Sequence, residues 1–152
     1  MRLELTRKAD LAARTLVVLA GRDRLKAGDL AEELGTTNGF VPQVVGPLVR
    51  AGWVRSEPGP TGGYALGVDL ATVSLLDVIE AADGPTDTGR CVVVDRPCDS
   101  ASPCAVHDAW AQARHLLTST LASTTVLDLA TRGVAIAAAS NGAASRTITK
   151  EQ

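Results

Sequence analysis

A short strand–turn–strand pattern lies between helical patterns, and it constrains the fold of this chain more than any other feature. The segments WVRS (53–56) and GYALG (63–67) are strand candidates, and EPGPTG (57–62) between them is made of turn residues. Glycine supplies positive φ and proline restricts φ, so this composition predicts a β-hairpin with a Gly/Pro tip. Aromatic residues make up only 3% of the chain. The core must therefore be built from Leu, Val, Ile and Ala, which favours packed helices around the hairpin.

Two helical segments open the chain. In 10–20, DLAARTLVVLA, apolar residues recur at helical spacing, with Asp10 as the expected cap or first residue and Gly21 as the end. A shorter helix is expected over 28–35, GDLAEELG, where leucines four residues apart share one face and Gly35 ends the helix. The pattern predicts two short amphipathic helices joined by a polar turn.

A third helical segment, GFVPQVVGPLVR (39–50), leads into the hairpin. Pro42 lies in its first turn, where a missing N–H matters little. Pro47 lies in its interior, where proline costs roughly 3 kcal/mol, so a kink or an early end is expected there. Three helices followed by a hairpin predict a winged helix-turn-helix. The alternative is another small α+β domain that carries one hairpin.

The second half of the chain carries two more helices. Residues 74–83, SLLDVIEAAD, begin with a serine and place Asp77 three residues later, which is close to a capping box. Ser102 and the proline after it are expected to start a long helix from about Cys104 to Thr120 or beyond. A helix of this length on a small domain often pairs with a second copy. The expected organisation is a winged helix-turn-helix domain (1–84), a cysteine-bearing loop (85–103), a dimerisation helix (104–129) and a flexible tail (130–152).

Charge and cysteine content limit the class of protein. Residues 1–66 carry nine Lys/Arg and seven Asp/Glu, whereas 67–152 carry six and ten. A weakly basic first half fits an N-terminal module that faces DNA, although a soluble enzyme could divide its charge in the same way. Three cysteines are too few for a disulfide scaffold. Because no apolar run reaches the roughly 18 residues of a membrane helix, we expect a protein of the reducing cytoplasm without a membrane partner.

The segment CVVVDRPCDSASPCAVHDAW carries the most chemistry. Six residues separate Cys91 from Cys98, five separate Cys98 from Cys104, and two separate Cys104 from His107. Thiolate and imidazole ligands suit zinc, copper or an iron–sulfur cluster rather than magnesium or calcium. Three interpretations stay open: an iron–sulfur cluster, a zinc site with three Cys and one His, and three unrelated reduced cysteines. Zinc sites usually contain closely spaced C-x₂₋₄-C pairs, which this segment lacks.

No pattern in the chain indicates an enzyme. Cys104 and His107 would need a pocket and an orienting third group to act as a nucleophile and base. GPTGGY lacks both the GK[ST] ending and the strand-to-helix context of a phosphate loop. We therefore expect a non-catalytic protein.

Several segments together resemble the Rrf2 family of bacterial transcription regulators. They are MRLELTRKADLAARTLVVLA, the hairpin GPTGGYALG, the helix SLLDVIEAADGP, the cysteine loop and the ending TTVLDLA, which cover about residues 1–129 in order. The resemblance implies a homodimer of winged helix-turn-helix subunits that cross through the long C-terminal helix. It also implies an iron–sulfur cluster in the loop before that helix.

The resemblance implies two ligand sets for the cluster. CAVHDAW resembles the iron–sulfur assembly regulators (IscR type), in which three Cys and one His hold a 2Fe–2S cluster, and this maps onto Cys91, Cys98, Cys104 and His107. DLAARTL resembles the nitric-oxide-sensing regulators (NsrR type), in which an Asp at the place of Asp10, donated by the other subunit, completes a 4Fe–4S cluster. We favour His107 and a 2Fe–2S cluster, because His107 lies beside Cys104. The 4Fe–4S cluster is the alternative.

The same resemblance implies how the protein meets DNA. Gln43 is the side chain expected to bind an adenine edge, since glutamine can do so with two hydrogen bonds. Pro58 stands where the family usually has an arginine that enters the minor groove. The DNA-facing residues expected by position are Arg2, Arg7, Lys8, Thr37, Asn38, Gly39, Gln43, Gly59 and Thr61.

The expected function follows from these assignments. A homodimer binds a near-palindromic operator in double-stranded DNA, and a cluster that responds to redox state, nitric oxide or iron–sulfur status controls the binding. The alternative is a cluster-free or zinc-bound regulator of the same fold that acts through a partner protein or a small-molecule effector.

Overall fold

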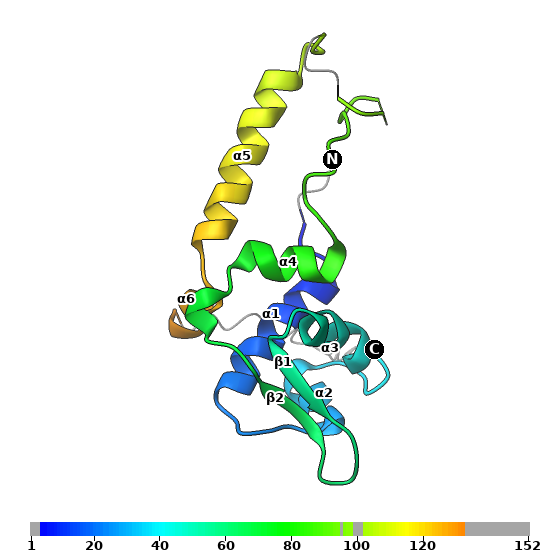
Figure 1. Ribbon diagram of the computed structural model, residues 1–152, viewed down its shortest axis with the longest axis vertical. Helices are drawn as coiled ribbons and strands as arrows, with labels where there is room; N and C mark the ends of the chain where they lie inside the picture. The colour runs from blue at the N-terminus through cyan, green and yellow to red at the C-terminus, as the bar shows by residue number, and fades with distance from the viewer. Residues whose placement is uncertain (1–3, 95, 99–101, 133–152) are drawn as a thin grey trace, which may run out of the picture.

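The protein is mainly helical, with one two-stranded antiparallel hairpin (Figure 1). The computed structural model describes residues 4–94, 96–98 and 102–132. The expected fold class is confirmed. In chain order the elements are α1 (Arg7–Ala20), α2 (Ala27–Leu34), α3 (Val41–Arg50), β1 (Val54–Glu57), β2 (Gly63–Leu66), the 3₁₀ helix η1 (Leu70–Thr72), α4 (Leu75–Asp83), α5 (His107–Ser123) and α6 (Val126–Thr131).

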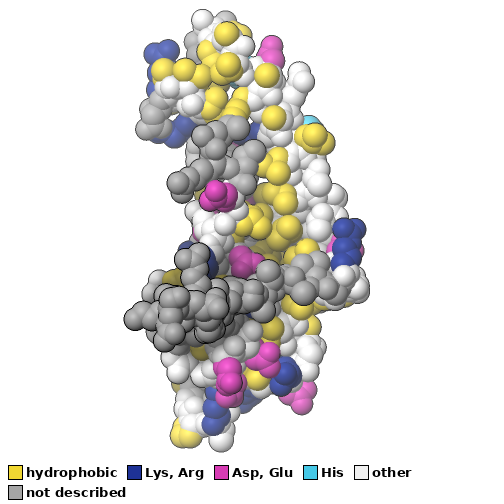
Figure 2. All heavy atoms as spheres, turned by 180° about the vertical axis from the view of Figure 1, so that it is seen from behind, with side chains coloured by type: hydrophobic (Ala, Val, Ile, Leu, Met, Phe, Trp, Pro, Cys, Tyr) yellow, Lys and Arg dark blue, Asp and Glu magenta, His cyan; other side chains and the backbone are white. Residues whose placement is uncertain are grey.

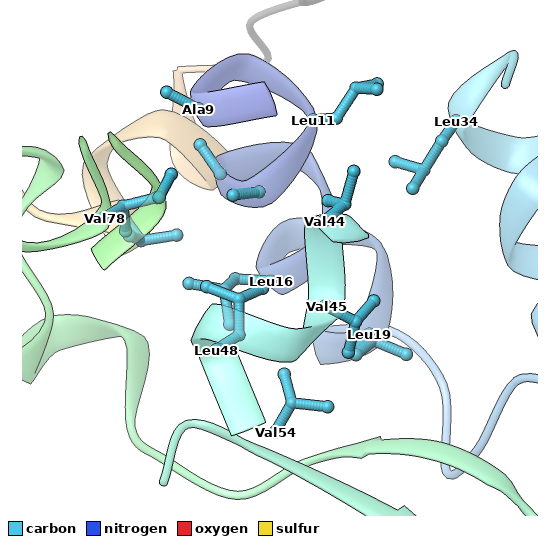
Figure 3. Close-up of a cluster of buried hydrophobic side chains, with 14 of the residues drawn as sticks. Ala9, Leu11, Leu16, Leu19, Leu34, Val44, Val45, Leu48, Val54 and Val78 are labelled. Carbon is cyan, nitrogen blue, oxygen red and sulfur yellow. The ribbon is translucent and has the colours of Figure 1, made fainter. Parts of the chain in front are cut away.

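Helix α1 lies at the centre of the core. One face of it is fully buried, and α2, α3, α4, α6 and strand β2 all pack against it. Burying one leucine or valine side chain contributes about 1.5–3 kcal/mol, so this aliphatic cluster supplies the main stabilisation of the fold. Figure 3 shows side chains from α1, α3, β1 and α4 meeting in it, among them Leu11, Leu16, Leu19, Val44, Leu48, Val54 and Val78.

The start of α1 differs from the expectation. Thr6 is the N-cap, and its Oγ1 accepts a hydrogen bond from the backbone N–H of Ala9 at 3.0 Å. Asp10 is the fourth residue of the helix and lies 3.9 Å from Arg14 in an (i, i+4) ion pair. The prediction that Asp10 caps or begins α1 is therefore wrong. Ala9 is 2% exposed, so the buried face of α1 begins one residue before Asp10. The helix therefore starts earlier, and Thr6 precedes it as a residue type that caps helices well.

The turn between α2 and α3 follows the sequence pattern, whereas α3 itself does not. Gly35 ends α2 in the left-handed conformation with φ 62°, as expected. Helix α3 has Pro42 in its first turn and then continues through Pro47 to Arg50. The expected early end at Pro47 is therefore wrong, whereas a kink at this residue stays a prediction. Its ring is buried beside the core residues of α3, and this burial offsets the backbone hydrogen bond that proline cannot make.

The hairpin forms the wing, and backbone hydrogen bonds connect it to the loop before α2. Strands β1 and β2 pair antiparallel, with Val54 opposite Leu66. Leu25, in the loop before α2, adds an isolated antiparallel bridge by exchanging backbone hydrogen bonds of 2.9 and 2.8 Å with Tyr64. At the tip a Cβ on Gly62 would lie 2.1 Å from the carbonyl oxygen of Glu57, so the close turn requires glycine there.

Helix α4 begins as predicted. Ser74 and Asp77 form a reciprocal capping box, and Gly84 ends the helix with φ 95°. The hydroxyl of Ser74 accepts from the N–H of Asp77 at 3.0 Å, and the Asp77 carboxylate accepts from the N–H of Ser74 at 2.9 Å.

The long C-terminal helix is shorter than expected and is followed by a second helix. Helix α5 begins at His107 rather than at Ser102 or Cys104, and it ends at Ser123. Residues 124–125 are extended, and Thr125 then caps α6 through a second capping box. The range 104–129 is thus not one helix. Val126 is fully buried, so α6 folds back onto the core instead of prolonging α5.

The expected tail and the membrane question can be compared only with the described residues. The expected tail at 130–152 overlaps the end of α6, and residues 133–152 lie outside the described part. Within the described ranges, no helix has the length and apolar content that crossing a membrane demands.

Candidate metal centre and DNA-facing surface

A small hairpin-like loop holds two of the cysteines. The N–H of Cys91 donates to the carbonyl of Arg96 at 2.9 Å, and the N–H of Cys98 donates to the carbonyl of Gly89 at 3.0 Å. Arg90 and Pro97 form an isolated antiparallel bridge between these bonds. Cys91 and Cys98, although seven positions apart in sequence, are therefore neighbours on opposite arms of one turn.

The four expected ligands line one cavity. Cys98 Sγ lies 3.1 Å from His107 Nδ1, and the thiols of Cys91 and Cys104 are hydrogen-bonded to each other. All four side chains border a cavity of about 210 Å³ between the cysteine loop and the first turns of α5. Of the ligand set expected from the sequence, the structure thus brings three cysteines and one histidine together. None of the three cysteines is in a disulfide.

Backbone hydrogen-bond donors surround the sulfur of Cys91. The N–H groups of Val94 and then Val93 hydrogen-bond to its sulfur and lower the pKa of the thiol, with smaller contributions from Cys104 and the Arg96 guanidinium. A lowered thiol pKa favours the thiolate, which is the form that ligates metals. The loop therefore favours the thiolate form of Cys91.

The donor geometry suits a centre larger than a single ion. Within the described residues, no three His, Cys, Asp or Glu side chains converge closely enough to hold one metal ion. A closed tetrahedral zinc site needs four ligands around one point, and here the donors form two pairs on the wall of one cavity. One water occupies about 30 Å³ in the liquid, so the cavity has room for a group of several atoms. Three thiols and one imidazole on such a cavity fit an iron–sulfur cluster.

Asp10 lies elsewhere on the chain. Its carboxylate pairs with Arg14 on α1, and it is not among the residues that line the cysteine cavity of its own subunit. A ligand role for Asp10 from a second subunit stays a prediction.

Polar contacts fasten the cysteine loop to α4 and α5. The Arg114 guanidinium binds the Asp87 carboxylate at 2.7 Å across the cavity wall. At the C-terminal end of α4, the Glu80 carboxylate accepts from the Thr86 hydroxyl at 2.6 Å and from its N–H at 2.9 Å. The loop is therefore bonded to the two helices that flank it.

The residues expected to read DNA bases lie on an exposed surface. Thr37, Asn38 and Gly39 form the turn before α3, and Gln43 is exposed on the first turns of that helix. The wing residues Gly59 and Thr61 are exposed at the tip of the hairpin. Their roles on DNA stay predictions.

The basic residues near the N-terminus differ in their surroundings. Arg7 is exposed and donates to the carbonyl of Gly35 at 3.3 Å. The ammonium group of Lys8 donates to the carbonyl of Ala82 at the end of α4, where a cation is favourable. Arg2 lies outside the described residues. Phosphate contacts by these three side chains stay predictions.

Helix α5 carries an exposed apolar face. Along α5, which the structure describes in full, no residue is buried, and Leu116 and Leu117 are 69% and 46% exposed. Figure 2 shows hydrophobic side chains in a column along the upper half of the molecule, where α5 stands. A second cavity of about 310 Å³ along this helix is lined mainly by apolar atoms of Trp110, Leu117 and Leu121 together with four further residues.

Sequence reasoning missed three residues that shape these sites. Trp110 lines both cavities, Arg114 ties the loop to α5, and Arg24 binds Glu57 at 2.7 Å and the carbonyl of Thr61 at 3.1 Å at the wing. The spacing of Trp110, three residues after His107, places both on one helical face and could have indicated it. The two arginine contacts depend on tertiary structure and leave no signal in the pattern.

Comparisons with known proteins agree with this architecture. The model of the Rrf2 family, described as "Iron-dependent Transcriptional regulator", matches residues 5–132. The transcriptional regulator IscR of Vibrio vulnificus is 29% identical over 130 residues, which cover 84% of this chain and 77% of that protein. The global cysteine regulator CymR of B. subtilis has a similar structure, with a TM-score of 0.68 at 25% identity over 86% of this chain and 98% of that one.

A further solved structure shares the fold. The IscR of T. potens matches with a TM-score of 0.66 at 20% identity, and the match covers 86% of this chain and 88% of that one. Because the family model spans most of the sequence and the winged helix-turn-helix is present, the chain belongs to the Rrf2 family of transcription regulators.

Proposed function

We propose that this protein is a homodimeric transcription regulator that binds an operator in double-stranded DNA under the control of an iron–sulfur cluster. Cys91, Cys98, Cys104 and His107 would hold the cluster, with 2Fe–2S favoured and 4Fe–4S as the alternative. When bound, the cluster supplies a centre that oxidation or nitric oxide can alter. The single observation that carries this proposal is the shared cavity of three thiols and one imidazole.

The mixed ligand set supports a sensing role. His107 is the one expected ligand that is not a thiolate, and a neutral imidazole is a weaker ligand for iron than a negatively charged, soft thiolate. Its Nδ1 faces Cys98 at 3.1 Å. His107 is also the first residue of α5, so a change at this ligand acts directly on the start of that helix.

The path from the cavity to the DNA-facing surface is short. Helix α5 packs against α4, which packs against both α1 and α3. The Asp87–Arg114 ion pair and the Glu80–Thr86 hydrogen bonds tie the loop to the same helices. In a dimer that crosses through α5, a shift of this helix would alter the separation of two α3 helices, which must enter major grooves about 34 Å apart. A hundredfold change in affinity needs about 2.7 kcal/mol of difference between the two states.

The proposal is tested by DNA binding with protein purified without air. A tight-binding duplex is first selected from random sequences, and its affinity is measured for the cluster-loaded and the apo protein over a range of salt concentrations. We expect an affinity that falls steeply with salt and that differs between the two forms by tenfold or more. Equal affinities would contradict cluster control, and no salt-dependent binding by either form would contradict DNA recognition.

A second candidate is direct thiol sensing without a cluster. The Cys91 and Cys104 thiols are in hydrogen-bond contact, and the oxidized form of Staphylococcus aureus CymR is a similar solved structure at 27% identity. Two thiols and one molecule of hydrogen peroxide would give one disulfide and two molecules of water. Intact mass spectrometry after treatment of the apo protein with peroxide distinguishes the candidates. A loss of two hydrogens that is absent in Cys104→Ser, combined with iron-free protein from anaerobic cells, would favour thiol sensing.

A further inference from the structure

Trp110 has a buried indole N–H that makes no hydrogen bond within the described part of the chain. Its Nε1 is the one buried side-chain nitrogen or oxygen in those residues that lacks a partner. An unpaired buried donor costs about 1–3 kcal/mol. Such a group in a folded protein calls for an explanation, and a ligand that accepts the hydrogen bond is one.

The location of Trp110 narrows what the acceptor can be. The side chain lines the cysteine cavity together with Cys91, Cys98, Cys104 and His107. These four are the residues proposed to hold the cluster. A bound cluster would bring sulfide ions and thiolate ligands into the cavity. Sulfide and thiolate sulfurs are hydrogen-bond acceptors, and donors to them raise the reduction potential because they stabilise the more negative reduced state.

Trp110 also borders the second cavity, on the apolar face of α5. Trp110 and Arg114 thus both line the cysteine cavity and the cavity on the exposed apolar face. A contact between the indole and the metal centre would therefore fix the first two turns of α5 relative to the loop.

We infer that Trp110 is a positioning residue whose indole N–H donates a hydrogen bond to a sulfur of the bound iron–sulfur centre. The inference rests on the proposed cluster and adds a residue beyond its four ligands. The bond raises the reduction potential of the centre and ties the start of α5 to it. The indole does not ligate iron.

The other tryptophan of the chain, Trp53, provides a matched control for substitution of Trp110, because it lies away from the cysteine cavity. Trp53 precedes β1 and packs against the hydrophobic core, and it does not line the cysteine cavity. Trp110→Phe removes the donor and keeps an aromatic ring. Trp53→Phe makes the same chemical change away from the centre. Both variants are loaded anaerobically, and iron and sulfide content is measured first.

The reduction potential is the decisive readout. We expect Trp110→Phe to bind iron and sulfide and to have a midpoint potential below that of the wild type, while Trp53→Phe keeps the wild-type value. Equal midpoint potentials in the wild type and Trp110→Phe would overturn the inference and leave the proposed cluster intact. Colourless wild-type protein without sulfide would overturn both.

A second measurement does not depend on the folding of Trp110→Phe. In Trp53→Phe, tryptophan labelled with ¹⁵N at the indole nitrogen reports on Trp110 alone. Pulsed electron paramagnetic resonance of the reduced cluster is expected to show a ¹⁵N coupling. Absence of this coupling, in protein that shows the cluster signal, would overturn the inference.

Discussion

At the scale of single residues, Asp128 links stability to pH. The N–H of Thr125, and then its hydroxyl, donate to the carboxylate and lower the pKa of Asp128, with Arg132 adding to the effect. A carboxyl whose pKa is lower in the folded state stabilises that state above its unfolded value of 3.8. This contribution is lost as the pH falls through the lowered folded value.

The prediction from Asp128 concerns the docking of α6. Urea unfolding at pH 5 and at pH 2.5 is expected to show a larger loss of unfolding free energy in the wild type than in Asp128→Asn. At neutral pH the variant is expected to be the less stable protein. Equal losses in the two proteins would show that this capping box contributes nothing to acid sensitivity.

Single residues also show where sequence patterns are informative. The Ser74–Asp77 capping box was predictable, because both partners lie within one turn of the helix that they cap. Thr6 was missed in favour of Asp10, since both are good caps and the burial of Ala9 decided between them. The partnerless Nε1 of Trp110 depends on packing that no local pattern contains.

At the scale of elements, helix α3 contains a proline whose buried ring offsets the cost of proline inside a helix. Pro47→Ala is expected to change the free energy of unfolding by less than about 1 kcal/mol. The regained helix preference of about 3 kcal/mol is opposed by the loss of roughly two buried methylenes and by the freer unfolded chain. Leu48→Ala, one position later, is expected to cost about 2–5 kcal/mol because it leaves a cavity.

Chemical denaturation of both variants checks this comparison. A loss of several kcal/mol in Pro47→Ala would show that the proline ring contributes more than its area suggests. A gain near 3 kcal/mol would show that burial offsets little.

The wing carries an ion pair of Arg24, and the nearby ion pair of Arg22 is a control for its effect on DNA binding. Arg24 binds Glu57 and the carbonyl of Thr61, whereas Arg22, two positions earlier, binds Glu33 on α2 at 2.8 Å. Removing either side chain deletes one positive charge, but only Arg24 holds the wing. Exposed ion pairs contribute up to about 1 kcal/mol. We expect Arg24→Ala to bind the selected duplex up to about fivefold more weakly than Arg22→Ala.

Fluorescence anisotropy at constant salt measures that difference. Equal affinities of the two variants would mean that the Arg24 contacts do not position the wing on DNA.

The elements themselves were largely predictable, and their ends were less so. Periodic leucines and valines predicted α1 to α4, and Gly/Pro chemistry predicted the hairpin, since both signals are local. Helix α5 was expected to start near Cys104 and run to 129. Its break at 124–125 depends on the docking of Val126 in the core and on the bridge between Thr125 and Ser74, both distant in sequence.

At the scale of the whole molecule, the apolar face of α5 predicts a dimer. Leu116→Glu combined with Leu117→Glu is expected to give a monomer in size-exclusion chromatography with light scattering, because two charges would enter the proposed interface. Val49→Glu, on α3 at 36% exposure, is the control and is expected to leave the dimer intact. A monomeric wild type, or a dimeric double variant, would contradict the proposed interface.

The central claim is that the cysteine cavity holds iron and sulfide. Its most direct test is the content of iron, acid-labile sulfide and zinc in protein purified without exposure to air, in the wild type and in Cys98→Ser. The account predicts a coloured wild type with iron and sulfide in about equal amounts, and loss of both in the variant. A colourless wild type with one zinc per chain, or with no metal, would contradict it.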